Sequence, residues 1–222
     1  MKMKFAGAGM ALLILAVTPL MTGCGNFWQA PTGTTTDTTA LTYSPTTVEV
    51  GTSVTLTATI STTSATGTVT FYNNTTKLGT GTVNSGVATL TYTFTSVGTD
   101  SITAEYGGDS TYEASTSSAV KITVNALTTT TTLAASSLTP VVNTSVTLTA
   151  TVSPSTATGT VTFYDGTTSL GTGTLTSTSK GQTTLSTKFT TSVAHSLTAV
   201  YGGDTNDAIS TSDAISVTPT AN

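Results

Sequence analysis

The stretch TSVTLTAT at residues 52–59 returns unchanged at residues 144–151. A second stretch, ATGTVTFY, occupies residues 65–72 and returns at residues 157–164, again after the first stretch. Internal repetition over this length indicates two copies of one folding unit. It decides the architecture before any single residue is considered.

A third motif, YGGD, stands at residues 106–109 and 201–204. It returns slightly later than the first two motifs do, so the second copy has a short insertion, which we place at residues 178–180. The chain has 222 residues, and an ordinary domain takes roughly 100–200 residues. Two copies, a leader and a linker account for the chain, and no separate catalytic domain is expected.

Apolar residues alternate with threonine in both copies, at the two-residue period of a half-buried strand. The apolar positions in the first copy are Val54, Leu56, Ala58, Ile60, Val69, Phe71, Leu90, Tyr92, Phe94, Ile102, Ala104, Tyr106, Val120, Ile122 and Val124. Short turn signals separate the runs: Asn73 and Asn74, Gly79, Ser85 and Gly86, then Asp165 and Gly166, Gly171, Lys180 and Gly181. About seven short antiparallel strands per copy and no helical period predict an all-β protein of two tandem β-sandwich domains.

Composition narrows the classes of function. Only 7% of the residues are charged and the formal net charge is −4. No basic patch can therefore form to neutralise the phosphates of a nucleic acid, which excludes nucleic-acid partners.

Three phrases in fixed order resemble those of the bacterial immunoglobulin-like (Ig-like) domain repeats of group 3. They are a VTLTATV strand, a GTVTFYDG hairpin and an ITAVYGGD strand with its turn. The resemblance covers roughly residues 36–219, and it implies Ig-like domains at 36–125 and 126–219. Antibody domains have an inter-sheet disulfide and a buried tryptophan, which this chain lacks. We expect Phe71 and Phe163 to fill the position of that tryptophan.

The N-terminus has the layout of a secretory signal, with Lys2 and Lys4 before a short apolar run. The sequence LMTGC then resembles the lipobox of bacterial lipoproteins. This resemblance implies a signal peptide at 1–23, acylation of Cys24 including palmitate, and a linker at 24–35. An uncleaved anchor, or an ordinary signal peptide with an unused cysteine, is the alternative. We expect export and lipid anchoring in the cell envelope, at the outer membrane or cell surface, although the sequence leaves the choice of membrane open.

The Gly-Gly-Asp turns allow two interpretations. Asp109 with Glu113, and Asp204 with Asp207, could direct oxygens toward calcium, but calcium takes 6–8 oxygen ligands. We favour a structural turn, in which the aspartate accepts hydrogen bonds from nearby amides. Asp109 and Asp204 stay as weak calcium candidates, and no metal or other cofactor is expected.

Catalysis has little support in the sequence. His195, the only histidine, flanks a strand and is expected to be exposed and inert, with no serine or aspartate placed beside it by any motif. The sequence therefore predicts a non-enzymatic protein. A hydrolase is the third of three hypotheses for the function, and the first two are non-enzymatic.

The leading hypothesis is a structural spacer or protein interaction module, attached to the membrane through its lipid. The alternative is an adhesin or carbohydrate-binding protein with a protein or polysaccharide partner. Sugar binding normally uses exposed aromatic rings, and Tyr72 and Tyr164 are the weak candidates for this role, followed by Tyr112 and Tyr43. Packing at a strand end explains Tyr72 and Tyr164 equally well.

Overall fold

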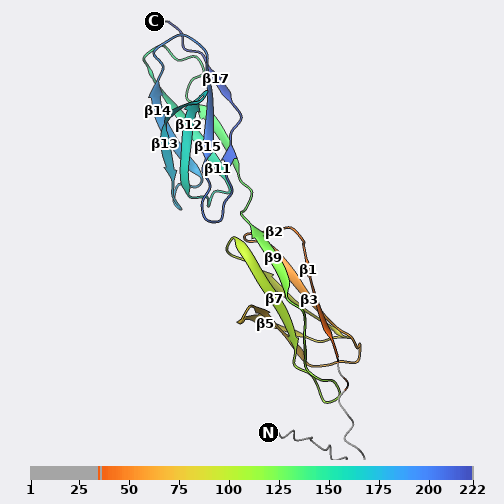
Figure 1. Cartoon of the computed structure of the whole chain (residues 1–222). Helices are drawn as coiled ribbons and strands as arrows, with labels where there is room; N and C mark the ends of the chain where they lie inside the picture. The colour runs from red at the N-terminus through yellow and green to blue at the C-terminus, as the bar shows by residue number, and fades with distance from the viewer. Residues whose placement is uncertain (1–34, 36, 222) are drawn as a thin grey trace, which may run out of the picture. The chain divides into compact units, whose positions relative to one another are not determined.

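The computed structural model describes Thr35 and residues 37–221. Every regular element in this part of the chain is a β-strand, and the strands form two β-sandwiches of two sheets each (Figure 1). The all-β prediction and the prediction of two tandem sandwiches are confirmed.

The first sandwich has a three-stranded sheet and a six-stranded sheet. The three-stranded sheet has the order β1 (Thr39–Ser44), β3 (Ser53–Ile60) and β6 (Val87–Thr93). The other sheet has the order β2 (Val48–Glu49), β9 (Val120–Asn125), β7 (Gly98–Tyr106), β4 (Thr68–Asn73) and β5 (Thr76–Thr82), and β8 (Ser115–Thr116) pairs with β7.

The second sandwich repeats this topology except that no named strand corresponds to β2. Its three-stranded sheet has the order β10 (Thr130–Ala135), β11 (Ser145–Ser153) and β14 (Gln182–Lys188). Its five-stranded sheet has the order β13 (Thr168–Leu175), β12 (Gly159–Asp165), β15 (His195–Tyr201) and β16 (Ser210–Thr211), and β17 (Ile215–Val217) pairs with β15.

One strand pair departs from the antiparallel expectation. The chain leaves the three-stranded sheet after β1 and enters the opposite sheet as β2, which pairs with β9 in parallel. Strands β2, β8 and β16 are only two residues long. A two-residue strand has no visible alternation, so a pattern of period two cannot predict it.

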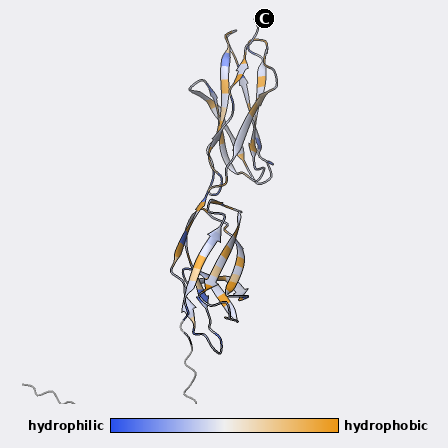
Figure 2. Cartoon of the chain, turned by 90° about the vertical axis from the view of Figure 1, so that its right-hand side faces the viewer, coloured by the Kyte–Doolittle hydropathy of each residue, from blue (hydrophilic) through white to orange (hydrophobic). Residues whose placement is uncertain are grey.

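The predicted inward positions form the two cores. In β3, the side chains of Val54, Leu56 and Ala58 are fully buried and Ile60 is 3% exposed, while the threonines between them face outward or lie at intermediate depth. Figure 2 shows apolar residues spaced along the strands of both sandwiches. Burying one such aliphatic side chain stabilises a fold by about 1.5–3 kcal/mol. Because neither sandwich has a cysteine, packing and hydrogen bonds must provide the stability.

The aromatic centres of the two cores correspond between the copies. Phe71 and Phe163 are completely buried, which confirms that they occupy a core position. Tyr106 and Tyr201, at the ends of β7 and β15, are also completely buried.

The interpretation of Gly79 and Gly171 as turn residues is wrong, because both lie inside strands, β5 and β13. They lie where the strand packs closely against the facing sheet. A Cβ atom on Gly79 would come 2.9 Å from Cδ1 of Leu90, and one on Gly81 would come 2.6 Å from the backbone oxygen of Thr89. These glycines therefore serve close packing rather than chain reversal.

Candidate functional site

The strongest concentration of polar contacts in each sandwich lies at the Gly-Gly-Asp loop. In the second sandwich this loop begins where β15 ends at Tyr201. Gly203 has a φ of 76°, and a Cβ atom on it would lie 2.8 Å from the backbone oxygen of Asp207. A side chain at this position would be strained and would have no space, so the loop needs a glycine there.

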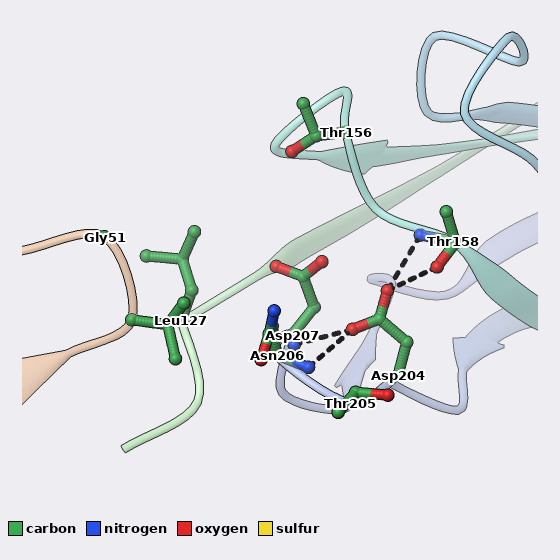
Figure 3. A pocket seen from close by; sticks show the side chains of 9 residues that line it. Gly51, Leu127, Thr156, Thr158, Asp204, Thr205, Asn206 and Asp207 are labelled. Carbon is green, nitrogen blue, oxygen red and sulfur yellow. Dashed lines mark hydrogen bonds between the residues drawn. The ribbon is translucent and has the colours of Figure 1, made fainter. Parts of the chain in front are cut away.

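The carboxylate of Asp204 binds backbone groups on both sides of it (Figure 3). Its Oδ1 accepts hydrogen bonds from the amides of Asn206 and Asp207, each at 2.8 Å. Its Oδ2 accepts hydrogen bonds from the amide of Thr158 at 3.1 Å and from the Thr158 hydroxyl at 2.5 Å. Both oxygens are thus occupied by the protein itself.

The first sandwich has the same arrangement around Asp109. Oδ1 accepts from the amides of Thr111 at 2.8 Å and Tyr112 at 2.9 Å. Oδ2 accepts from the amide and the hydroxyl of Thr66, at 2.9 Å and 2.8 Å. This geometry supports the structural turn that the sequence favoured for Asp109 and Asp204, since neither carboxylate keeps an oxygen free for calcium.

These hydrogen bonds stabilise the ionised carboxylates. At Asp109, the amide of Thr111 and then the groups of Thr66 hold the pKa well below its ordinary value. At Asp204, burial raises the pKa, but the hydroxyl of Thr158 and the amides around the carboxylate outweigh it and lower the pKa to about 2.

In each sandwich, the hydroxyl of a buried tyrosine also binds the threonine that contacts the aspartate. The hydroxyl of Tyr106 donates to the backbone oxygen of Thr66 at 2.9 Å, and that of Tyr201 donates to Thr158 at 2.6 Å. Burial is the main cause that raises the pKa of Tyr201 to about 12, and it raises the pKa of Tyr106 as well. Both phenols therefore stay neutral and act as donors.

The two loops differ at one buried position. Tyr112 of the first loop is half-buried and packs against the hydrophobic core, whereas Asp207 takes the corresponding position in the second loop and is only 8% exposed. Burial and the negative charge of Asp204 raise the pKa of Asp207. In the sequence, Asp207 is only a companion of Asp204 as a calcium candidate, and no local pattern indicates its burial.

The tyrosines proposed as stacking platforms have different surroundings. Tyr43 and Tyr112 pack partly against the core of the first sandwich. Tyr72 and Tyr164 are half-buried, and each directly follows a β-bulge in β4 or β12. A bulge redirects the side chain that follows it, so these two rings are the better placed for a contact outside the fold.

The expectation of an exposed His195 with no aspartate beside it is wrong. Its Nδ1 lies 2.5 Å from Oδ2 of Asp165, and its side chain is only 15% exposed. Its ring also packs on Phe189, with 4.4 Å between the ring centroids, and its Nε2 is buried without a hydrogen-bond partner. The first sandwich has Asn73 and Asp100 in these positions, where Nδ2 of Asn73 donates to Oδ1 of Asp100 at 2.6 Å. A comparison of both positions between the copies could have predicted the pair.

The remaining predicted site, Cys24, lies outside the described residues, as do the signal peptide and nearly all of the linker. Among Thr35 and residues 37–221, no helix has the length and apolar character that crossing a membrane requires. No group of three or more His, Cys, Asp and Glu side chains within these same residues is arranged to hold a metal ion.

Several solved structures align with this chain at low similarity. The fibronectin(III)-like modules of Clostridium thermocellum CbhA are 19% identical, with a TM-score of 0.35, over 83% of this chain and 94% of that chain. Adhesin InvE of Yersinia pseudotuberculosis is 18% identical, with a TM-score of 0.37, over 81% of this chain and 58% of that chain. Domains of the outer capsid protein Hoc of bacteriophage RB49 are 16% identical, with a TM-score of 0.37, over 83% of this chain and 59% of that chain.

No curated protein sequence matches this chain. The family described as bacterial Ig-like domain (group 3) matches it twice, at residues 41–125 and at residues 131–220. Together these matches cover most of the sequence, and each coincides with one sandwich. The chain therefore belongs to the bacterial Ig-like domain (group 3) family.

Proposed function

We propose that the chain is a non-enzymatic, lipid-anchored protein of the cell envelope, whose tandem Ig-like domains serve as a structural spacer or protein interaction module. The observation that carries the proposal is that the sequence builds the same sandwich twice and uses its most strongly bound carboxylates, Asp109 and Asp204, within the fold.

The polar groups that could suggest catalysis have a structural explanation. The pair of His195 and Asp165 corresponds to Asn73 and Asp100, which form a hydrogen bond at the same place in the first sandwich. Asparagine and aspartate cannot replace the histidine of a catalytic triad, so the first sandwich has the contact without the chemistry. This favours a role for His195 in joining strands β12 and β15.

The anchor rests on the sequence LMTGC, in which Cys24 is the only cysteine of the chain. Each buried CH₂ of an acyl chain contributes about 0.8 kcal/mol of membrane affinity, so several acyl chains give stable attachment. Bacterial Ig-like domains are compatible with a surface protein, and we place this one in the outer membrane or on the cell surface.

Metabolic labelling tests the anchor. The Cys24→Ser variant should lose all incorporation of radiolabelled palmitate and should leave the membrane fraction, while Thr32→Ser in the linker keeps both. Labelling that survives Cys24→Ser would refute attachment at this residue.

The alternative function is that of an adhesin or carbohydrate-binding protein. It is favoured by Tyr72 and Tyr164, which follow corresponding bulges in both sandwiches. A glycan array tests it with Tyr164→Ala and Tyr164→Phe in a Tyr72→Ala background. Stacking predicts that the phenylalanine variant still binds and the alanine variant does not, whereas no binding to any glycan counts against this function.

A further inference from the structure

Exposed apolar side chains gather at one end of the second sandwich. Leu138 is 54% exposed, Val141 is 38% exposed and Val193 is 60% exposed. They are three of the six large hydrophobic side chains that are exposed within residues 37–221. Single apolar residues on a surface are ordinary, but a group of them marks an interaction site.

Backbone hydrogen bonds place the three residues on one surface, at the end of the second sandwich where the chain reaches residue 221 (Figure 1). The amide of Thr218 donates to the backbone oxygen of Leu138 at 2.8 Å. The amide of Asn143, in the same loop, donates at 2.8 Å to Phe189, from which the chain continues to Val193. We call this surface the apolar pole, and it consists of the segments 136–143, 190–194 and 218–221.

The apolar pole is uncharged and has a hollow in its surface. Its three segments contain no Asp, Glu, Lys, Arg or His. The hollow has a volume of about 520 Å³, and Val142, Val193 and Ala221 are among the residues that line it. Thr190 and Ser192 also line it and are exposed, so neutral hydroxyls surround the apolar side chains.

The first sandwich builds the same backbone framework at its corresponding end. The amide of Val50 donates to the backbone oxygen of Asn125 at 2.9 Å, as the amide of Val142 donates to Thr220 at 3.0 Å. Both hydrogen bonds accompany a parallel pairing of the same two segments. The framework therefore does not depend on the side chains that it presents to solvent.

Those side chains differ between the two sandwiches. Leu138 and Val141 occupy the positions that Thr46 and Glu49 occupy in the first sandwich. Because the backbone is held in the same way with a polar and a charged residue there, the fold does not require the two apolar side chains. The apolar pole is specific to the second sandwich, and a contact with another molecule explains it.

We propose that the apolar pole is a homodimer contact, at which the same surface of a second copy of this chain docks about a two-fold axis. In such a contact each group near the axis meets its own copy, so a charge there would repel itself. The pole has no charge, and Val141 replaces a glutamate. Such a dimer specifies the partner of the interaction module proposed above, so it rests on that role, but it does not require a lipid on Cys24.

The composition of the pole also suits a contact with itself. Protruding apolar side chains and a hollow lie on the same surface, so each copy offers both the group that is buried and the space that receives it. The exposed hydroxyls of Thr190 and Ser192 supply a neutral polar rim, which can donate and accept hydrogen bonds across the contact.

Sedimentation equilibrium of the full-length chain, in a detergent whose density matches the solvent, tests the dimer. Because three short segments form the contact, we expect an interface below about 1,200 Å² in total and a dissociation constant above about 1 μM. The measured mass should therefore rise from one chain toward two as the protein concentration passes through the dissociation constant.

A double variant locates the contact. Leu138→Thr combined with Val141→Glu introduces the residues of the first sandwich and should raise the dissociation constant by about tenfold or more. Ile209→Thr is the matched control, because Ile209 is 75% exposed in the same sandwich but lies next to β16, which pairs with the opposite end of β15. It should dimerise like the original chain. Equal urea midpoints show that the double variant and the control are folded alike.

Chemical cross-linking gives a second signal that is independent of the anchor. Val193→Cys and Ile209→Cys are each combined with Cys24→Ser, so that each chain has one thiol. A bis-maleimide with a flexible spacer should link two chains through Cys at position 193 and not through Cys at position 209.

Three results would overturn the dimer. They are a chain that stays monomeric up to about 1 mM, a dimer that the double variant does not weaken, and assemblies of more than two chains, which indicate a head-to-tail contact. None of these results alters the palmitate labelling of Cys24, so a failure of the dimer and a failure of the anchor are distinguishable.

Discussion

The hydroxyl of Tyr201 donates a hydrogen bond of 2.6 Å to the backbone oxygen of Thr158, and the side chain of Thr158 in turn binds Asp204. The end of β15 is thereby tied to the start of β12 through one residue. The first sandwich has the same connection through Tyr106, Thr66 and Asp109. Its presence in both copies indicates that this connection belongs to the fold rather than to a ligand.

Removal of the Tyr201 hydroxyl tests this connection. Tyr201→Phe keeps the buried ring but leaves the oxygen of Thr158 without its donor, so the second sandwich should lose about 1 kcal/mol of its free energy of unfolding. Urea unfolding followed by tyrosine fluorescence measures the change. Tyr164→Phe is the matched control and should be neutral. A neutral Tyr201→Phe would show that the hydrogen bond adds no stability.

Acid should weaken both loops. The pKa of Asp204 is about 2, below the ordinary value of 3.8, and that of Asp109 is lowered too. Because the folded state binds the proton less tightly than the unfolded state, the ionised carboxylates stabilise the fold above about pH 4, and this stability is lost as the pH falls through the folded values. Urea midpoints measured from neutral pH down to about pH 2 test this. In the Asp204→Ala variant, the stability of the second sandwich should fall less as the pH is lowered toward about 2. An equally steep fall would contradict the prediction.

Asp207 should have the opposite dependence on pH. Its pKa is raised in the folded state, so the folded state retains the proton longer and stability falls as the pH rises above the unfolded value of 3.8. The stability of Asp207→Asn relative to the original chain should therefore grow between about pH 4 and neutral pH. A difference in stability that does not vary with pH would show that folding does not raise the pKa of Asp207.

Exchange of the paired residues tests the structural role of His195. His195→Asp alone places a second carboxylate beside Asp165 and should destabilise the second sandwich at neutral pH by on the order of 1 kcal/mol. The additional change Asp165→Asn recreates the pair of Asn73 and Asp100 and should restore most of that loss. A double-mutant cycle measured by urea unfolding gives the coupling energy between the two positions. Without rescue, the two positions would not act as a pair.

The glycines of β5 give a steric prediction. A Cβ atom at position 81 would lie 2.6 Å from the backbone oxygen of Thr89, so Gly81→Ala should destabilise the first sandwich by about 1–3 kcal/mol. Gly107→Ala is the control, because its Cβ would have only an ordinary contact, at 3.8 Å from the oxygen of Thr68. Equal stability of the two variants would contradict this packing.

The sequence predicted those parts of the fold that leave a local pattern. Alternation located the long strands and placed Phe71 and Phe163 in the cores, and the repeat established that there are two domains. The pairing of β2 with β9 left no such pattern, because two residues are too few to show a period. Gly79 was misassigned because the residue type alone does not distinguish a glycine that permits close packing from a glycine that permits a turn.

The candidate site was predictable in part. The Gly-Gly-Asp motif indicated the turns, and hydrogen bonds to Asp109 and Asp204 agree with that interpretation. The contact of His195 with Asp165 and the burial of Asp207 depend on strand register and on neighbouring segments. Such contacts join positions far apart in sequence, so they could be inferred only by comparing the two copies residue by residue.

We propose that a lipid on Cys24 holds the two Ig-like domains in the envelope. Mass spectrometry of the N-terminal peptide, from protein extracted from the membrane fraction, is the decisive experiment for this anchor. We expect a mature chain that begins at Cys24 and has acyl chains on the sulfur and on the amino group. A mature chain that begins elsewhere, or an unmodified Cys24, would contradict it.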